Sequence, residues 1–254
     1  MRILVSNDDG FQAPGLAALV GALSDLADLT VVAPSRDRSA TSNSITVSRP
    51  LTIERAENGF YSVDGKPADC VHIAITGFLG FKPDLVVSGI NNGSNLGDDT
   101  IYSGTVAAAM EGFLLGVPAI AFSMAHKPAA NFETGAAVAR ALVQRVLASP
   151  PREPWLLNVN IPDVAHHELR GEKVVRLGKR HQAEPVSRVY AANGVEQWKI
   201  GGVGPAADAG PDTDFGAIAE NYVSISPLTV DLTAHQSLAA VAAWCGSASH
   251  ARSA

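Results

Sequence analysis

Residues 3–10 read Ile3-Leu4-Val5-Ser6-Asn7-Asp8-Asp9-Gly10, and this stretch predicts both a strand and a site. The apolar run over 3–5 is typical of a strand buried on both faces, as in the middle of a parallel sheet. Asp8 and Asp9 follow at its carboxyl end, where open α/β sheets bind their ligands. Gly10 lets the backbone turn sharply, so that both carboxylates can point into one site. Because neighbouring negative charges repel, the pair favours a bound cation or a proton. A turn with an Asp helix cap is the alternative interpretation.

The segments up to Pro162 alternate between strand and helix patterns. Apolar residues recur at helical spacing over 16–23, and a second strand over 29–33 completes a parallel βαβ unit with a right-handed crossover. This alternation predicts the fold class: an α/β protein with a doubly wound, mostly parallel, Rossmann-like sheet. No Gly-x-Gly-x-x-Gly fingerprint follows the first strand, so a dinucleotide site is not expected. The further predicted strands cover 84–88, 117–123 and 155–160, a hairpin covers 45–53 and 60–63, and helices cover 67–79 and 132–147 and begin at 106.

Beyond Pro162 the pattern changes. Residues 174–178 and 186–200 resemble β-strands or arms, 222–226 is a further strand, and Thr233-Ala234-His235-Gln236 has capping-box spacing before a last helix. We therefore expect an α/β core over 1–162, an arm and C-terminal helix of the same domain over 163–245, and a disordered tail over 246–254. The basic cluster Lys179-Arg180-His181 is interpreted as a solvated or intersubunit patch, with phosphate recognition as the alternative.

The composition limits the class of protein. With 46% hydrophobic and 17% charged residues in 254, the chain can bury a sizeable core and disorder is not expected. A net charge of −6 without a basic run argues against binding to nucleic acid duplexes. No secretory signal or membrane span is visible, so a soluble cytoplasmic protein is expected. Cys70 and Cys245 are far apart and are expected to be buried thiols in a reducing compartment.

Two further polar loops follow predicted strands. Residues 35–44 are rich in hydroxyl groups, and residues 89–99 are rich in Gly and Asn and lead to Ser103-Gly104-Thr105 at the start of a helix. Because the carboxyl ends of parallel strands share one edge of a sheet, both loops can converge on Asp8 and Asp9. The helix start offers free N–H groups and a positive dipole end, which is a ready anion site. Ordinary helix capping by Ser103 or Thr105 is the alternative.

The residue types in these loops favour one chemistry. Carboxylates, hydroxyls and amides are hard oxygen donors that suit Mg²⁺ or Mn²⁺, whereas a zinc site would normally recruit His or Cys. A divalent cation beside a helix N-terminus can polarise a phosphoryl group and activate water, which indicates phosphate ester hydrolysis. A covalent aspartyl-phosphate on Asp8 or Asp9 is the competing mechanism. The Asp-x-Asp spacing typical of that route is absent, as is the Gly-x-Ser-x-Gly elbow of α/β-hydrolases.

The same segments resemble the SurE family of survival-protein nucleotidases. The resemblance runs over nearly the whole chain except the tail, and it is weakest around 180–205. Ala40 is a departure, because a Gly commonly follows the serine at that point in the family. The segments that carry the resemblance are Met1–Gly10, Arg38–Ser44, Ser88–Glu111, Asp208–Asp214 and Val230–His235.

The resemblance implies a metal-dependent 5′-nucleotidase that releases phosphate from nucleoside monophosphates, often with 3′-nucleotidase or exopolyphosphatase activity. It implies one Mg²⁺ or Mn²⁺ per subunit, and homodimers or homotetramers in which the C-terminal part reaches across to a partner. The implied metal ligands are Asp8, Asp9, Ser39 and Asn91, and the implied phosphate-side residues are Asn43, Asn95, Ser103, Gly104 and Thr105, of which Asn43, Asn95 and Ser103 join Asp8 as the catalytic set.

Other functions remain open at this point. A nucleotide- or polyphosphate-binding sensor would keep the same site without useful turnover. A metal-dependent glycosyltransferase is a weaker alternative, because its usual acidic pair is spaced by one residue and lies deeper in the chain. Whether Asp8 only holds the metal or also contacts the attacking water is likewise open.

Overall fold

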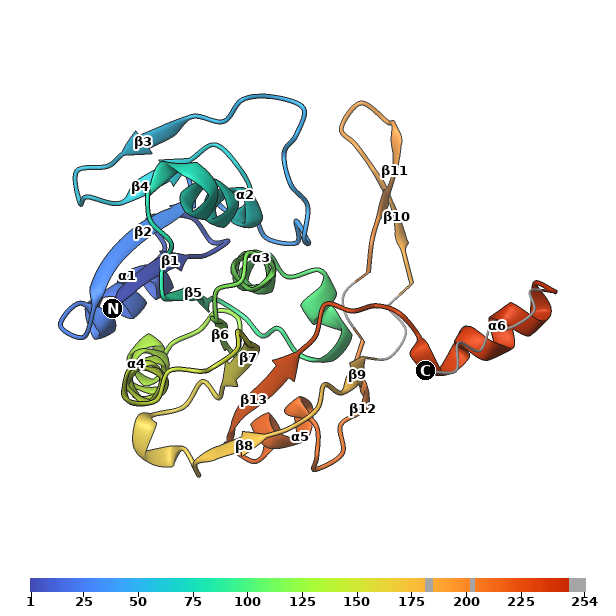
Figure 1. Ribbon diagram of the computed structural model, residues 1–254. Helices are drawn as coiled ribbons and strands as arrows, with labels where there is room; N and C mark the ends of the chain where they lie inside the picture. The colour runs from blue at the N-terminus through green and yellow to red at the C-terminus, as the bar shows by residue number, and fades with distance from the viewer. Residues whose placement is uncertain (181–184, 202–203, 247–254) are drawn as a thin grey trace.

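The central sheet of the protein is mostly parallel. The computed structural model describes residues 1–180, 185–201 and 204–246, and within these residues the sheet has nine strands in the order β3-β4-β2-β1-β5-β6-β7-β13-β8 (Figure 1). Neighbouring strands from β4 to β7 run parallel, whereas β13 is antiparallel to β7. The predicted α/β fold class is confirmed. The parallel strands are β1 (Arg2–Ser6), β2 (Asp28–Pro34), β4 (Tyr61–Val63), β5 (Leu85–Asn91), β6 (Ala119–Met124) and β7 (Leu156–Ile161).

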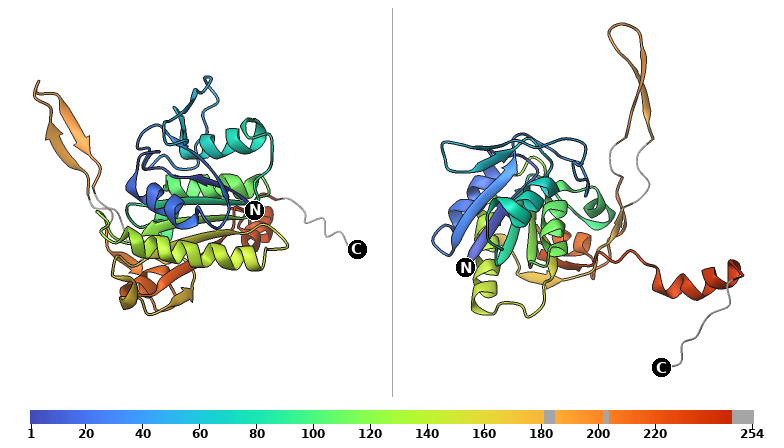
Figure 2. Two further views of the ribbon diagram at one scale, coloured as in Figure 1. Left: turned by 90° about the vertical axis from the view of Figure 1, so that its left-hand side faces the viewer. Right: turned by 45° about the horizontal axis from the view of Figure 1, so that its top comes forward.

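Helices cover both faces of this sheet. On one face, α1 (Pro14–Leu23) and α4 (Phe132–Ala148) pack on Ile3 and Val5. On the other, α2 (Pro67–Ile73) and α3 (Gly104–Leu114) pack on Leu4, as the views in Figure 2 also show. The apolar run at the start of the chain is therefore buried on both faces, as its composition predicts. Because β1 pairs with β2 on one side and β5 on the other, the strand order reverses at β1, and a ligand crevice is expected at its carboxyl end.

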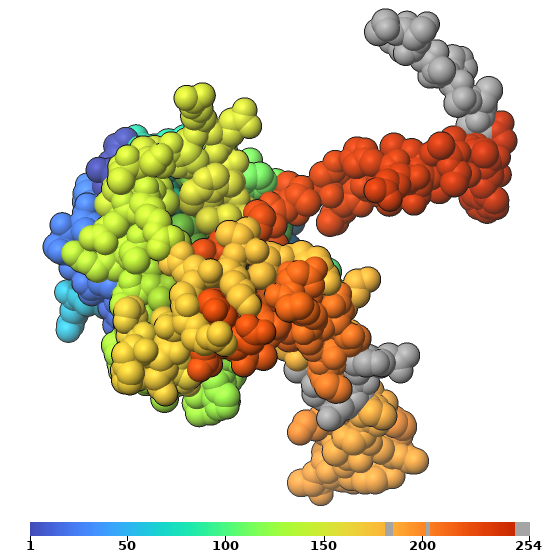
Figure 3. Space-filling view, turned by 90° about the horizontal axis from the view of Figure 1, so that it is seen from below, coloured from blue at the N-terminus to red at the C-terminus, as the bar shows by residue number. Residues whose placement is uncertain are grey.

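The C-terminal part adds strands to the sheet and two projections. A hairpin of β10 (Ser187–Tyr190) and β11 (Glu196–Lys199) and the helix α6 (Leu238–Trp244) leave the α/β body in different directions (Figures 2 and 3). The boundary at Pro162 stays a prediction, and residues 247–254 of the expected tail lie outside the described residues. The other elements here are η3 (His166–Glu168), β8 (Glu172–Val174), β9 (Lys179–Arg180), β12 (Ala206–Asp208), α5 (Asp214–Ala219), β13 (Val223–Leu228) and η4 (His235–Ser237).

Several predicted elements are shorter or differently placed in the structure. The expected strand over 45–53 is only β3 (Ile53–Arg55), because Asp69 binds the N–H and hydroxyl of Thr46, both at 2.7 Å, in place of a strand partner. The helix predicted over 67–79 ends at Ile73 and continues as a π-helical turn, η1 (Ala74–Phe78). The loop expected from Gly89 begins later, because β5 runs to Asn91, and it contains the 3₁₀ turn η2 (Gly97–Ile101).

The C-terminal helix also differs from its prediction. No side chain caps α6, which follows the 3₁₀ turn η4, so the expected capping box at Thr233 is wrong. Cys70 is buried as predicted, but Cys245 is exposed, because α6 projects from the body instead of packing on it.

Among the described helices, none has the length and apolarity needed to cross a bilayer.

Candidate functional site

Asp8 lies at the carboxyl end of β1 and contacts the start of α3. Its carboxyl Oδ1 accepts a hydrogen bond from the Thr105 hydroxyl, and only 4% of the residue is exposed. Gly104 packs against the same side chain: a Cβ there would lie 2.7 Å from Asp8 Cβ and 2.9 Å from Oδ2. The backbone carbonyl of Asp8 accepts from the Arg38 N–H at 2.8 Å, which joins the loop after β2 to the same corner. The predicted convergence of three strand ends is therefore present around Asp8.

The environment of the two carboxylates opposes their ionisation. Burial raises the pKa of Asp8 to about 6; the neighbouring Asp9 adds to the rise, and the Thr105 hydroxyl bond works against it. Burial also raises the pKa of Asp9, although the Asn92 N–H, which donates to Asp9 Oδ2 at 2.9 Å, opposes this. Both shifts express the cost of placing negative charge in a buried corner without a counter-ion.

The loop after β2 brings Ser39 and an acid that sequence analysis missed. Asp37 accepts from both the N–H and the hydroxyl of Ser39, each at 2.7 Å, and these bonds hold the pKa of Asp37 below its usual range. The negative charge of Asp37 raises the pKa of Asp8 and Asp9, so it acts on the same site. The available signal was an Asp two residues before Ser39, a spacing typical of a local turn.

The loop after β5 supplies the amide groups. Asn91 ends β5, and its side-chain N–H group donates to the Gly93 carbonyl at 2.8 Å, so a cation would have to use its amide oxygen. Its neighbour Asn92, absent from the predicted set, joins Asp9 to the segment after β6, because its side-chain oxygen accepts from the Ala129 N–H at 2.8 Å.

Asn95 is held on both sides of its backbone by β7. Its N–H donates to Asn160 Oδ1 at 2.8 Å, and its carbonyl accepts from the amide groups of Asn158 and Asn160 at 2.8 and 3.0 Å. Its side-chain amide donates to the Ser123 hydroxyl at 2.7 Å. Sequence analysis missed these supporting residues, although the signal was present as two asparagines within the apolar run over 155–161.

Ser103 and Thr105 have different roles at the start of α3. Ser103 is the N-cap, because its hydroxyl oxygen accepts from the Val106 N–H at 3.0 Å. Ordinary helix capping, the alternative interpretation of this segment, is therefore present at Ser103. Thr105 instead binds Asp8. The first turn of α3 therefore has its N–H groups and positive dipole end beside the Asp8 carboxylate, which is suitable for a phosphoryl group.

Asn43 is the predicted phosphate-side residue whose role has the least support from the contacts in the structure. It is exposed, and the loop that carries it is fixed at Ser42, which donates to the carbonyls of Tyr102 and Ile101 at 3.1 and 2.7 Å. Ser42 thus holds Asn43 near the two residues that precede Ser103. None of the hydrogen bonds among the described residues, however, joins Asn43 to the other predicted site residues. Ala40 in the same loop has a φ of 58°, a conformation that suits the Gly common there in the family.

These residues fit a hard divalent cation. Carboxylate, hydroxyl and amide oxygens from three strand ends are the donors that Mg²⁺ and Mn²⁺ prefer. Among the described residues, no three His, Cys, Asp or Glu side chains gather as a metal cluster; the predicted set has two acids, and its other donors are a hydroxyl and an amide. The side-chain oxygen of Asn7, directly before Asp8, is buried without a partner in the described part of the chain, so the corner has unused oxygen-donor capacity.

Arg180 joins the C-terminal part to the loop before α3. Its guanidinium group pairs with Asp99 of η2 and lies 5.3 Å from the centre of the Phe215 ring, so Arg180 is not a solvated residue, while the intersubunit interpretation of its cluster stays a prediction. Asp214 makes a second tie, because it accepts from the N–H groups of Gly97 and Gly178 at 2.7 and 2.8 Å. His181 of the cluster lies outside the described residues.

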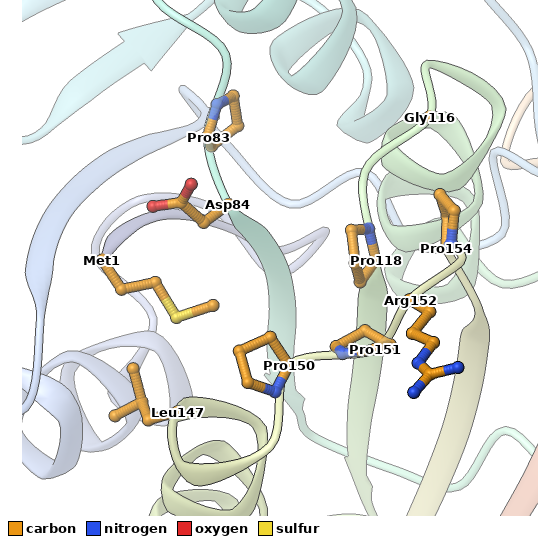
Figure 4. A pocket seen from close by; sticks show the side chains of 10 residues that line it. All are labelled: Met1, Pro83, Asp84, Gly116, Pro118, Leu147, Pro150, Pro151, Arg152 and Pro154. Atoms are coloured by element: carbon orange, nitrogen blue, oxygen red, sulfur yellow. The ribbon is translucent and has the colours of Figure 1, made fainter.

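A hollow of about 670 Å³ lies at the opposite edge of the sheet (Figure 4). Met1, directly before β1, and Pro83 and Asp84, directly before β5, are among the residues that line it. It is therefore at the amino ends of the strands, away from the edge where parallel sheets bind ligands, and none of the predicted site residues line it.

Together these observations define a doubly wound α/β protein with an oxygen-donor site at the point where its strand order reverses. The chain belongs to the SurE family, because the family model described as "Survival protein SurE" matches residues 3–184. It is 54% identical over 244 residues to the 5′-nucleotidase SurE of Laribacter hongkongensis (strain HLHK9), covering 96% of this chain and 99% of that protein. It is 56% identical over 244 residues to the 5′-nucleotidase SurE of Methylococcus capsulatus, covering 96% and 97%. The crystal structure of the SurE protein from Aquifex aeolicus matches it with a TM-score of 0.85 at 41% identity, covering 96% of this chain and 99% of that one.

Proposed function

We propose that this chain is a metal-dependent phosphomonoesterase that hydrolyses nucleoside 5′-monophosphates to nucleoside and phosphate. The observation that carries the proposal is the contact of Asp8 with Thr105 and Gly104, because it joins an acidic corner to a helix N-terminus. Such a junction can hold a cation and a phosphoryl group side by side. The relatives that carry the name 5′-nucleotidase support the substrate class.

Each part of the chain has a separate task in this reaction. Asp8, Asp9, Ser39 and Asn91 would hold the cation with their side-chain oxygens, and the first turn of α3 would bind the phosphoryl oxygens with its N–H groups. When bound, Mg²⁺ or Mn²⁺ supplies positive charge that polarises the phosphoryl group and lowers the pKa of water. The hydroxyl of Ser103, the amide of Asn95 and, from the exposed loop, Asn43 would orient the phosphoryl group between these two sides.

The contacts of Asp8 favour attack by water over attack by the carboxylate. Its Oδ1 accepts from the Thr105 hydroxyl, and Gly104, which has no side chain, leaves space beside Oδ2 that a Cβ would fill. A buried carboxylate whose Oδ1 already accepts a hydrogen bond is poorly placed for in-line attack on phosphorus, whereas its Oδ2 can still orient a cation or accept a proton from water. Activity on nucleoside 3′-monophosphates and on polyphosphate chain ends is part of the same proposal, since the recognised group is a terminal phosphoryl group.

A phosphate-release assay over a panel of nucleoside monophosphates, with Mg²⁺, Mn²⁺ or EDTA, tests this proposal. We expect release from nucleoside 5′-monophosphates with either metal and none with EDTA, and recovery when metal is restored. A folded protein that binds nucleotides in calorimetry but releases no phosphate with any of the metals would instead be the nucleotide-binding sensor.

We further propose that the hairpin and α6 bind a second copy of the chain in a homodimer or homotetramer. Trp198 of the hairpin is 60% exposed and Trp244 of α6 is 87% exposed, and large apolar surfaces of this kind are typical of interaction sites. Light scattering of the full chain is expected to give a dimer or tetramer mass, and the Trp198→Glu and Trp244→Glu variants a lower one. A monomer mass for the unaltered chain would contradict this.

A further inference from the structure

Lys127 is a charged residue at the site edge that sequence analysis did not select. It follows β6, so it lies at the same carboxyl edge of the sheet as Asp8 and Asn91. Its side chain packs along the backbone of Gly93: a Cβ built there would lie 3.4 Å from Lys127 Cδ and 3.5 Å from its Cβ. The absence of a side chain at Gly93 therefore leaves room for the aliphatic part of Lys127 beside the loop that carries the predicted amide ligand Asn91.

The backbone beside Lys127 is tied to the acidic corner through one residue. Asn92 donates its N–H to Asp9 Oδ2 at 2.9 Å, and its side-chain oxygen accepts from the Ala129 N–H at 2.8 Å. The segment that carries Lys127 is thereby fixed to the same residue that fixes Asp9. Lys127 is consequently held near the site by Asn92 and Gly93 together.

The charge of Lys127 lies at the edge of the acidic corner. Its side chain packs against Gly93, and the adjacent Asn92 binds Asp9, so the ammonium group adds positive charge beside the loop that fixes this acid. None of the ion pairs among the described residues involves Lys127, so its ammonium group is not committed to a protein carboxylate at close range. An exposed ammonium on a flexible stem can move a short distance toward another anion.

We propose that Lys127 binds an anionic oxygen of the substrate's phosphoryl group, and that it opposes the binding of the divalent cation through its charge beside the loop that fixes Asp9. This rests on the proposed nucleotidase function. Two cations near the same carboxylates repel each other, so the positive charge of Lys127 would weaken the binding of the metal. With the carboxylates neutralised by a bound cation, an anionic oxygen of the phosphoryl group would be the partner left for the Lys127 ammonium group, in a charge-assisted hydrogen bond.

The two roles predict opposite changes when the charge is removed. Without the ammonium group, the metal meets less repulsion and binds more tightly, whereas the phosphoryl group loses a partner and binds less tightly. A residue that merely supports the loop would change both affinities in the same direction, because loss of the loop geometry weakens both ligands. The sign of each change therefore separates a substrate contact from a structural role.

The test compares Lys127→Met, which keeps the stem, with Lys127→Arg, which keeps the charge, and with Lys82→Met. Lys82 is a matched control because it precedes β5 at the opposite edge of the sheet, near Gly116. Calorimetry would measure the binding of Mn²⁺ alone and then of inorganic phosphate to the Mn²⁺-loaded protein, and a phosphate-release assay would measure KM and kcat for a nucleoside monophosphate.

For Lys127→Met we expect the Kd for Mn²⁺ to fall about two- to fivefold, as for loss of a screened charge interaction. The Kd for phosphate and the KM should rise about tenfold, as for loss of a charge-assisted hydrogen bond, with a smaller change in kcat. Lys127→Arg should restore both affinities, and Lys82→Met should leave them unchanged. Any other combination of the two binding changes would overturn the proposal. Absence of turnover in the unaltered protein would refute the proposed function but leave both binding measurements valid as a test of Lys127.

Discussion

Asp8 and Ser39 are both predicted metal ligands, but the structure builds their surroundings in different ways. Asp8 is buried at the end of a central strand, with Thr105 and Gly104 closing on its side chain. Ser39 is exposed, and its hydrogen bonds go to Asp37 of its own loop, which is attached to the body by the Arg38 N–H on the Asp8 carbonyl and by Ser42. The comparison indicates that the site has two halves. We call Asp8 with Thr105 and Gly104 the rigid half, because the sheet sets its geometry, and the loop that carries Ser39 the adjustable half, because local turns set its geometry. Changes in the rigid half should therefore affect stability and metal binding together, whereas changes in the loop should affect binding alone.

Gly104→Ala should have the largest combined effect. Its Cβ would overlap Asp8, with approaches of 2.7 Å to Asp8 Cβ and 2.9 Å to Oδ2. We expect a loss of about 1–3 kcal/mol in the free energy of unfolding, as for other overpacked buried positions, and loss of Mn²⁺ binding. Gly21→Ala is the matched control, since nothing lies within 4 Å of a Cβ there and α1 should gain about 0.5–1 kcal/mol. Denaturant unfolding and calorimetry measure both quantities; unchanged metal binding in Gly104→Ala would argue against a rigid half.

Ser39→Ala should separate binding from stability. The side chain is exposed, so the free energy of unfolding should change by no more than about 0.5 kcal/mol. Loss of one hydroxyl ligand should weaken Mn²⁺ binding by about tenfold, comparable to the loss of a supporting group around a metal. A variant that is destabilised as strongly as Gly104→Ala would show that the loop belongs to the rigid half.

The pH dependence of stability in the absence of metal reports on the rigid half. The pKa of Asp8 is raised from 3.8 to about 6 by burial, so the folded state holds this proton more tightly than the unfolded chain does. The contribution of Asp8 to stability is therefore fully present below pH 4 and is lost as the pH rises through 6. Asp8→Asn should lack this part of the pH profile, which unfolding experiments on both proteins in EDTA would measure. Saturating Mn²⁺ should reverse the trend in the unaltered protein, because a bound cation favours the ionised carboxylate. Parallel profiles for the two proteins in EDTA would count against this assignment.

Ala40→Gly should have the smallest effect. Ala40 has a φ of 58°, which costs about 1 kcal/mol for a residue with a Cβ, and the greater freedom of Gly in the unfolded chain offsets part of the gain. Stability should thus rise by less than about 1 kcal/mol, with metal binding unchanged. A substantial change in Mn²⁺ affinity would show that the backbone at this position controls the placement of Ser39.

The sequence predicts the rigid half better than the adjustable half. The buried strand before Asp8 and the helix after Ser103 have strong local patterns, and parallel topology alone brings their ends together. Asn160, Asn92 and Lys127 were missed because their roles depend on contacts between distant segments, such as Asn95 with Asn160, that no local pattern encodes. Cys245 was predicted to be buried because a cysteine without a partner or metal-ligand spacing is usually a buried thiol, yet it is exposed since α6, which precedes it, extends away from the body.

The proposed chemistry can be tested most directly by phosphate release from a nucleoside 5′-monophosphate in the presence of Mn²⁺, compared between the unaltered protein and Asp8→Asn. Asp25→Asn is the control, since Asp25 pairs with Arg140 on the surface, far from the site. We predict metal-dependent release by the unaltered protein and by Asp25→Asn, and a loss on the order of 10²–10³-fold in Asp8→Asn, as when a central electrostatic group of an active site is removed. Release by Asp8→Asn at the rate of the unaltered protein would contradict the central role of this residue.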